Sequence, residues 1–192
     1  MHKLTRDDLL TLEAYARERP ALRGEVIAHK RRRTVQLGEH LSVVFEDRRS
    51  VQYQIQEMLR IERIFEAAGI QDELDAYNPL IPDGSNLKAT LLVQYDDPDQ
   101  RARELQKLRG LEDQIELQVG DDRVTAIADE DMERSNEQKT SAVHFLRFEL
   151  SPAMLEAWND GARVELRSTH PACRVEAVLT PAQRHALAAD FR

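Results

Sequence analysis

The spacing of apolar residues in the first 85 positions predicts helices separated by one pair of strands. Apolar residues at helical spacing follow Thr5, a predicted N-cap, and Pro20 is expected to break this helix and to start a second one. Apolar and polar residues alternate over positions 35–45 on both sides of Gly38, which is typical of a hairpin with one buried face. A long helix over residues 47–68 and a short helix over 71–77 complete this half.

The second half repeats a strand, a polar capping residue and a proline that starts a helix. Pro98, Pro152 and Pro181 each follow such a cap, and two further strand pairs flank Gly120 and Pro171. Hairpins this frequent do not fit an all-parallel sheet. The sequence therefore predicts an α+β fold with a mixed, mainly antiparallel sheet, about seven strands and about six helices.

The length of 192 residues suits a single domain. We expect a helical N-terminal half, residues 1–85, packed on a strand-rich C-terminal half, residues 86–192, because the apolar faces of the first helices need a partner. The polar, acidic stretch 129–139 is predicted to form a long mobile loop.

Composition indicates a soluble protein, because 41% of the residues are hydrophobic, 32% are charged, and no apolar run is long enough to span a bilayer. The single cysteine, Cys173, cannot form an intrachain disulfide. The N-terminus lacks the apolar core of a secretory signal. Both observations favour the cytoplasm.

The net charge of −8 repels phosphate backbones, so we expect no binding of nucleic acid. The local exception is the basic run His29-Lys30-Arg31-Arg32-Arg33. This run is either an exposed cationic helix end, which suits the helix dipole, or a contact for a phosphate or an acidic partner.

A carboxylate falls within the apolar stripe of the predicted helix 47–68. Val51, Ile55, Met58 and Phe65 follow helical spacing, and Glu62 lies three positions before Phe65 on the same face. A charge in an apolar setting costs several kcal/mol unless it is paired or bound to a metal. The sequence therefore predicts a partner for Glu62.

Three neighbours extend this candidate site, namely Glu57, Arg60 and Glu66. Glu62 and Glu66 are four residues apart on the helix and could present two oxygens to one cation. Two interpretations stay open: a structural Glu–Arg pair that holds the helix to the sheet, or a ligand or divalent metal site.

Two histidines are the other candidate ligands. His144 alternates with Leu146 and Phe148, which places it on the apolar face of a strand. His170 and Cys173 lie on either side of Pro171 in a predicted turn, but one His-x-x-Cys pair is a weak zinc signal. A metal site would therefore be built from Glu62 with His144 or His170, and the alternative is a core or turn role for both histidines.

Several chemistries are excluded by missing motifs. The chain has no G-x-G-x-x-G, no G-x-x-x-x-G-K-[ST] and no G-x-S-x-G segment. One cysteine cannot provide C-x-x-C redox chemistry or hold an iron–sulfur cluster, and no histidine follows a glutamate at the spacing of ferritin-like iron helices. No complete catalytic motif is present.

Several stretches together resemble the bacterial domain of unknown function family 3501. These are QIQEMLRIER (54–63), ELDAYNPLIP (73–82), LKATL (87–91), VHFLRF (143–148) and His170-Pro171. The resemblance covers nearly the whole chain and implies one compact cytoplasmic unit, with no established activity to transfer. It also implies a setting beside a rubrerythrin-like protein and an iron–sulfur oxidoreductase subunit. Relatives often carry an aromatic residue where this chain has Ala172, so a ligand role for Cys173 would be a local trait.

Two functions of different classes follow. The first is a non-catalytic accessory protein that docks onto a protein partner. This partner would belong to a rubrerythrin or iron–sulfur redox system, which acts against oxidative stress. The second is a metal-dependent or ligand-binding enzyme that uses Glu57, Arg60 and Glu62 with His144 or His170.

Overall fold

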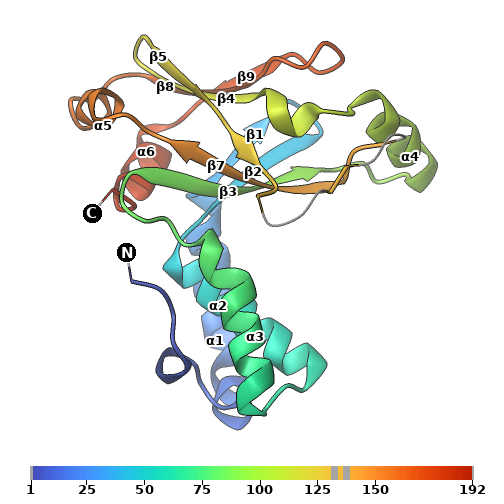
Figure 1. Cartoon of the computed structure of the whole chain (residues 1–192), viewed down its shortest axis with the longest axis vertical. Helices are drawn as coiled ribbons and strands as arrows, with labels where there is room; N and C mark the ends of the chain where they lie inside the picture. The colour runs from blue at the N-terminus through green and yellow to red at the C-terminus, as the bar shows by residue number, and fades with distance from the viewer. Residues whose placement is uncertain (1, 131–133, 136–138, 192) are drawn as a thin grey trace.

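The computed structural model describes residues 2–130, 134–135 and 139–191. Six α-helices and nine strands lie in these residues (Figure 1), so the predicted α+β class is confirmed. The α-helices are α1 (Leu12–Arg31), α2 (Arg48–Glu62), α3 (Ala67–Tyr77), α4 (Pro98–Lys107), α5 (Pro152–Asn159) and α6 (Pro181–Ala188), and the 3-10 helices are η1 (Arg6–Asp8), η2 (Asn78–Leu80) and η3 (Leu111–Gln114). The strands are β1 (Thr34–Leu37), β2 (Leu41–Glu46), β3 (Asn86–Val93), β4 (Ile115–Val119), β5 (Asp122–Thr125), β6 (Ile127–Ala128), β7 (Val143–Glu149), β8 (Val164–Ser168) and β9 (Val175–Val178).

The strands form two antiparallel sheets, where the sequence predicted one mixed sheet. Sheet A has the order β1-β2-β3-β7-β6, and sheet B has the order β5-β4-β8-β9. The reason for the difference is that alternation marks the buried face of a strand without specifying which other strand pairs with it.

The main core lies between the two sheets, which are stacked in Figure 1. Alternate residues of each strand of sheet A enter this core, such as Val43 and Phe45 of β2 and Leu146 and Phe148 of β7. The intervening side chains of β2, β3 and β7 point away from sheet B. We call this second surface of sheet A the open face.

Helices α1, α2 and α3 form a helical lobe that extends from the open side of sheet A (Figure 1). Val51, Ile55 and Leu59 of α2 lie in a separate small core with residues of α3 and the N-terminal segment. Contrary to the prediction, α1 continues through Pro20 to Arg31, so Pro20 does not end the first helix. Packing of α1 along α2 compensates for the hydrogen bond that a proline removes. No helix in the described residues is both apolar enough and long enough to cross a membrane.

The two lobes do not coincide with the two halves of the sequence. Strands β1 and β2 come from the N-terminal half, yet they form one side of sheet A beside β3. The single domain over residues 1–192 stays a prediction, and this interleaving supports it.

Arg33, the last residue of the basic run, is buried, so the run is not simply an exposed helix end. Its guanidinium donates to the carbonyl oxygens of Phe45 at 3.0 Å, Glu46 at 3.1 Å and Ala186 at 2.9 Å, and it pairs with Asp190. Arg33 thus ties β2 to the C-terminal helix α6.

His29 is also used internally, because its Nε2 lies 2.6 Å from a carboxylate oxygen of Asp47, the N-cap of α2. Burial raises the pKa of Asp47, but Arg33, the backbone N–H of Ser50 and His29 lower it more, so the net pKa lies below its usual value. Arg31 and Arg32 remain exposed. The basic run therefore offers fewer available charges than its composition suggests.

Candidate functional site

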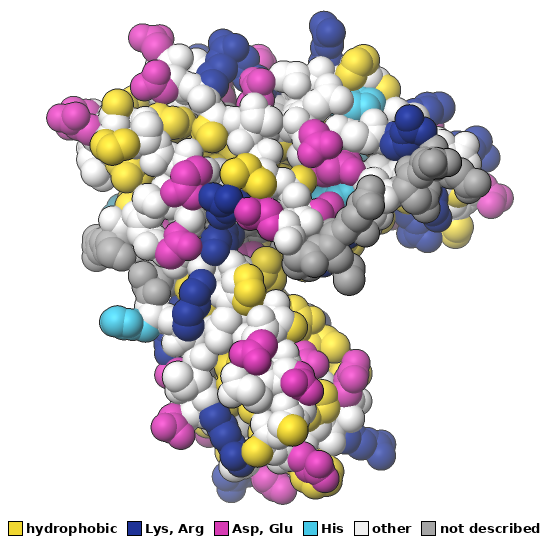
Figure 2. Space-filling model, in the orientation of Figure 1, with side chains coloured by type: hydrophobic (Ala, Val, Ile, Leu, Met, Phe, Trp, Pro, Cys, Tyr) yellow, Lys and Arg dark blue, Asp and Glu magenta, His cyan; other side chains and the backbone are white. Residues whose placement is uncertain are grey.

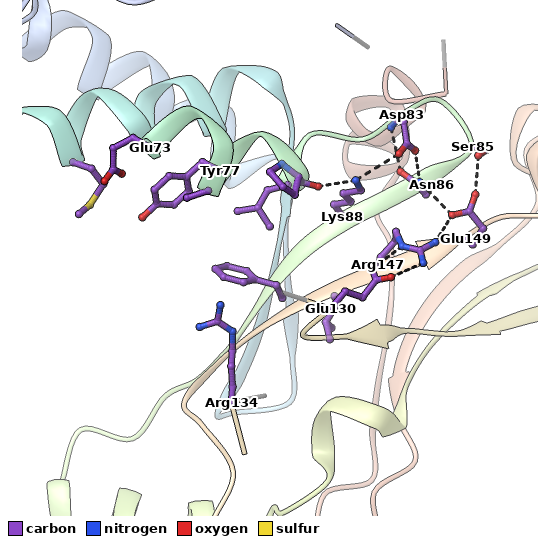
Figure 3. Close-up of a pocket in the computed structure, with 16 residues that line it drawn as sticks. Glu73, Tyr77, Asp83, Ser85, Asn86, Lys88, Glu130, Arg134, Arg147 and Glu149 are labelled. Carbon is purple, nitrogen blue, oxygen red and sulfur yellow. Dashed lines mark hydrogen bonds and ion pairs between the residues drawn. The ribbon is translucent and has the colours of Figure 1, made fainter. Parts of the chain in front are cut away.

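A cleft of about 910 Å³ separates the helical lobe from the open face of sheet A. Figure 2 shows mixed acidic and basic side chains where the two lobes meet, and Figure 3 shows Glu73 and Tyr77 of α3 on one side, with Glu130, Arg134 and Arg147 on the other. The volume is within the range of ligand-binding pockets. The cleft is lined by Met58, Glu73, Ala76, Tyr77, Pro79, Leu80, Asp83, Ser85, Asn86, Lys88, Glu130, Arg134, Phe145, Leu146, Arg147 and Glu149.

Arg147 of β7 is the centre of an ion-pair network at the sheet side of the cleft. Its Nε and Nη2 each lie 2.8 Å from a carboxylate oxygen of Glu130, and its Nη1 lies 2.6 Å from Glu149. The hydrogen bonds from Arg147 lower the pKa of Glu130. Both carboxylates are therefore committed to Arg147 at neutral pH.

The other two basic side chains of the cleft are also engaged. Lys88 of β3 donates to the carbonyl oxygen of Pro79 at 2.6 Å, and its Nζ lies 3.6 Å from Asp83. The guanidinium of Arg134 stacks 4.5 Å from the ring centre of Phe145. The Arg134 Nε lies 3.2 Å from an Asp129 oxygen.

A second, buried group of polar side chains lies behind β7, and we call Glu112, Asp129, Ser135, Thr140 and His144 the buried cluster. His144 is 0% exposed and Thr140 is 1% exposed, so the predicted burial of His144 is confirmed. His144 Nδ1 lies 2.5 Å from Asp129 Oδ2, and Nε2 lies 2.8 Å from the hydroxyl of Thr140. Glu112 Oε2 accepts from Thr140 at 2.9 Å, and Glu112 Oε1 accepts from Ser135.

Asp129 adopts a left-handed backbone conformation with φ of 47°, which is uncommon for a residue other than glycine. Its carboxylate holds it there, because Oδ1 accepts from the backbone N–H of Phe145 at 2.8 Å while Oδ2 bonds His144. Burial by itself raises the pKa of Glu112. Hydrogen bonds from Ser135, from the backbone N–H of Glu112 and from Thr140, together with the nearby His144, lower this pKa more. The net pKa of Glu112 is therefore below its usual value.

Asp129 and Arg134 connect the buried cluster to the cleft. Both lie in the stretch predicted as a mobile loop, of which residues 131–133 and 136–138 lie outside the described residues. The described part of this stretch is anchored by polar contacts to Glu112, His144 and Arg147.

The expected burial of Glu62 is wrong. Helix α2 ends at Glu62, and Arg63 takes a left-handed conformation with φ of 55°, so Phe65 lies beyond the helix and is 71% exposed. The apolar stripe instead runs through Val51, Ile55 and Leu59. Glu62 is exposed, and Glu66 is the exposed N-cap of α3.

The structural Glu–Arg pair occurs at Glu57 and not at Glu62. Glu57 accepts from Tyr15 at 2.7 Å and from the Nε and Nη2 of Arg19 at 2.7 and 2.9 Å, and Arg60 lies 3.3 Å away. The hydrogen bonds from Arg19 are the main reason why the pKa of Glu57 falls to about 2. This pair joins α1 to α2 within the helical lobe.

His170 has the turn role that the sequence left open. Its Nδ1 accepts from the backbone N–H of Ala172 at 3.2 Å, and its Nε2 lies 3.2 Å from the carbonyl oxygen of Arg109. Among the described residues, the only set of three or more acidic, histidine or cysteine side chains close enough to hold one metal ion is Glu112, Asp129 and His144. The structure therefore does not bring Glu62 together with either histidine in such a set.

The sequence did not predict Glu112 and Asp129 as residues of the site. Each is an acidic residue in a polar stretch, where carboxylates are normally solvated. The predicted burial of His144 required a polar partner, but nothing in the sequence shows which carboxylates meet it.

We predict that Glu57→Ala lowers the free energy of unfolding by about 1.5–3 kcal/mol, because Arg19 and Tyr15 lose a largely buried partner. Glu62→Ala, at an exposed position, should change it by less than about 0.5 kcal/mol. Urea denaturation at pH 7 measures both values. A lowered carboxyl pKa stabilises the fold above the unfolded-state pKa, so the Glu57 effect should shrink as pH falls from 4.5 toward 2. Equal losses for the two variants would contradict this order.

Comparison with known proteins supports the family assignment. A solved crystal structure of a protein of unknown function from Burkholderia pseudomallei K96243 is 52% identical to this chain, covers 100% of both chains, and matches with a TM-score of 0.95. No match is found among curated proteins. The model of the family described as "Protein of unknown function (DUF3501)" matches residues 3–191. The chain therefore belongs to the DUF3501 family.

Proposed function

We propose that this protein is a non-catalytic docking protein, and that a protein partner binds at the cleft and the adjoining open face of sheet A. The observation that carries this proposal is that the basic groups of the cleft are engaged by its own carboxylates and carbonyls. Arg147 is held by Glu130 and Glu149, and Lys88 by Asp83 and Pro79. Groups held in this way supply fixed charge for recognition and are poorly suited to transfer protons.

The open face adds an apolar surface to this charged cleft. Val44, Leu92, Val143 and Phe145 line a smaller cavity of about 440 Å³ that shares Tyr77, Leu80 and Phe145 with the cleft. An apolar centre beside a polar, charged rim is the usual arrangement of a protein–protein interface. This combination favours a protein partner.

The class of partner follows from the family setting. We take a rubrerythrin-like protein, or the iron–sulfur oxidoreductase subunit, as the candidate partner, and the cytoplasm as the compartment. Nucleic acid is not the expected partner, because the chain carries a net charge of −8 and Arg33 is committed to internal contacts.

Calorimetric titration of this protein with each purified candidate tests the proposal. Ala76 is an exposed residue of α3 that lines the cleft, and Ala68 is an exposed residue of the same helix outside it. We expect one candidate to bind, Ala76→Arg to weaken this binding at least about tenfold, and Ala68→Arg to change it less than about twofold.

Failure of both candidates to bind the wild-type protein would reject the proposed partner class. Equal binding by the two variants would instead show that the partner contacts another surface. Circular dichroism of both variants checks that the added arginine leaves the fold intact.

A further inference from the structure

We propose that the buried cluster binds one divalent transition-metal ion, such as zinc or manganese, through Glu112, Thr140 and His144. This site differs from the one expected from the sequence, since it contains neither Glu62 nor His170. It lies behind β7, and none of its three ligands lines the cleft or the adjoining cavity of the docking surface proposed above.

The first argument is the convergence of nitrogen and oxygen lone pairs around His144 Nε2. This atom faces the Thr140 hydroxyl oxygen at 2.8 Å and the Ser141 carbonyl oxygen at 3.1 Å. A carbonyl oxygen only accepts, and the single proton of the Thr140 hydroxyl is also needed by Glu112 Oε2 at 2.9 Å. The Ser135 hydroxyl donates to Glu112 Oε1 and lies 3.0 Å from Thr140 Oγ1, so it adds another oxygen to this group.

With Nδ1–H donated to Asp129, His144 Nε2 presents its lone pair to the same point as these oxygens. A cation placed at this point would be held by the lone pairs that converge on it. Two carboxylates flank the imidazole, namely that of the buried Glu112 and that of Asp129, whose side chain is 8% exposed. Their combined charge matches that of a divalent cation.

The second argument is the spacing of the candidate ligand atoms. His144 Nε2, Thr140 Oγ1 and Glu112 Oε2 form a triangle with sides of 2.8, 2.9 and 3.8 Å. A circle through these atoms has a radius of about 1.9 Å, so a point slightly off their plane lies at the roughly 2.0–2.2 Å of zinc bonds to nitrogen and oxygen from all three.

The third argument is the position of Asp129. Metal-binding histidines commonly donate their second ring N–H to a carboxylate, which fixes the tautomer and the ring orientation. Asp129 Oδ2 lies 2.5 Å from His144 Nδ1 and is suited to this role, and the strained backbone of Asp129 is held by the same contacts. One imidazole with oxygen ligands suits zinc or manganese better than a soft ion such as copper(I).

Elemental analysis and thermal unfolding test the proposal with the full chain. After dialysis against EDTA, addition of zinc or manganese chloride should load about one ion per chain and raise the melting temperature, as expected when a ligand binds only the folded state. Glu112→Gln keeps the side-chain shape and should weaken metal binding at least tenfold. Glu130→Gln and His170→Gln are matched controls that should retain it.

A spectroscopic measurement on the wild-type protein keeps the test independent of variant stability. On addition of zinc, the ¹⁵N resonance of His144 Nε2 should shift, while Nδ1 keeps its proton bond to Asp129. A folded wild-type protein that takes up neither metal, or a protonated Nε2 unchanged by excess zinc, would overturn the proposal. Full metal retention by Glu112→Gln would overturn it as well.

Discussion

A chain lacking residues 1–46 should show no cooperative unfolding transition near the melting temperature of the full-length protein. The deletion removes β1 and β2, whose buried residues Val35, Leu37, Leu41, Val43 and Phe45 belong to the main core. Burial of five such side chains contributes about 7–15 kcal/mol, which is as large as the net stability of a typical domain. The same deletion removes α1 from the helical lobe.

Thermal unfolding followed by circular dichroism measures this result. Addition of the separate 1–46 fragment provides a control, because restored cooperativity would show that the missing contacts, and not misfolding of the truncated chain, caused the loss. A fragment of residues 47–192 that melts cooperatively near the full-length temperature would disprove a single domain.

Arg33→Ala should lower the free energy of unfolding by about 3–5 kcal/mol, because it leaves buried carboxylates without their cation. Arg33 is 1% exposed and pairs with Asp190, which is also 1% exposed. The substitution also removes the donors to Phe45, Glu46 and Ala186. Arg32→Ala removes the same charge from an exposed neighbour and should cost less than about 0.5 kcal/mol.

The loss in Arg33→Ala should depend on pH in a defined direction. Burial raises the pKa of Asp190 to about 6 although Arg33 lowers it, so removal of Arg33 raises this pKa further. A carboxyl whose pKa is raised by folding stabilises the fold at low pH, and this contribution is lost as pH rises through the folded-state pKa. Urea denaturation should therefore give a smaller loss at pH 5 than at pH 8. A loss below 1 kcal/mol, or a larger loss at pH 5, would contradict the proposed role of Arg33.

Local features of the sequence were sufficient for several elements. Helices α4, α5 and α6 begin at Pro98, Pro152 and Pro181, as predicted. In each case a side chain of the preceding residue accepts from the helix backbone, and proline suits the first helical position. The burial of His144 was predictable for a similar reason, since alternation along a strand fixes which side chains share a face.

Other features depended on where helices end. Helical periodicity predicted a buried Glu62, but the chain turns at Arg63 and α2 buries Leu59 instead. A shift of one residue along a helix rotates the side chain by about 100°. An error of one or two residues in the predicted end of a helix therefore changes which side chains are assigned to its buried face. At Pro20 the sequence predicted a helix end that does not occur. Packing against α2 keeps α1 continuous through a residue that usually ends helices.

The sequence by itself determined the α+β class, the starts of the proline-led helices and the apolar face that carries His144, because these features depend on neighbouring residues. Only the tertiary structure decided that Arg33 meets Asp190, that Glu112 and Asp129 surround His144, and that α3 and sheet A enclose a cleft. These contacts join residues far apart in the chain, and a charged side chain in an ordinary polar segment carries no local signal of the partner that will bury it.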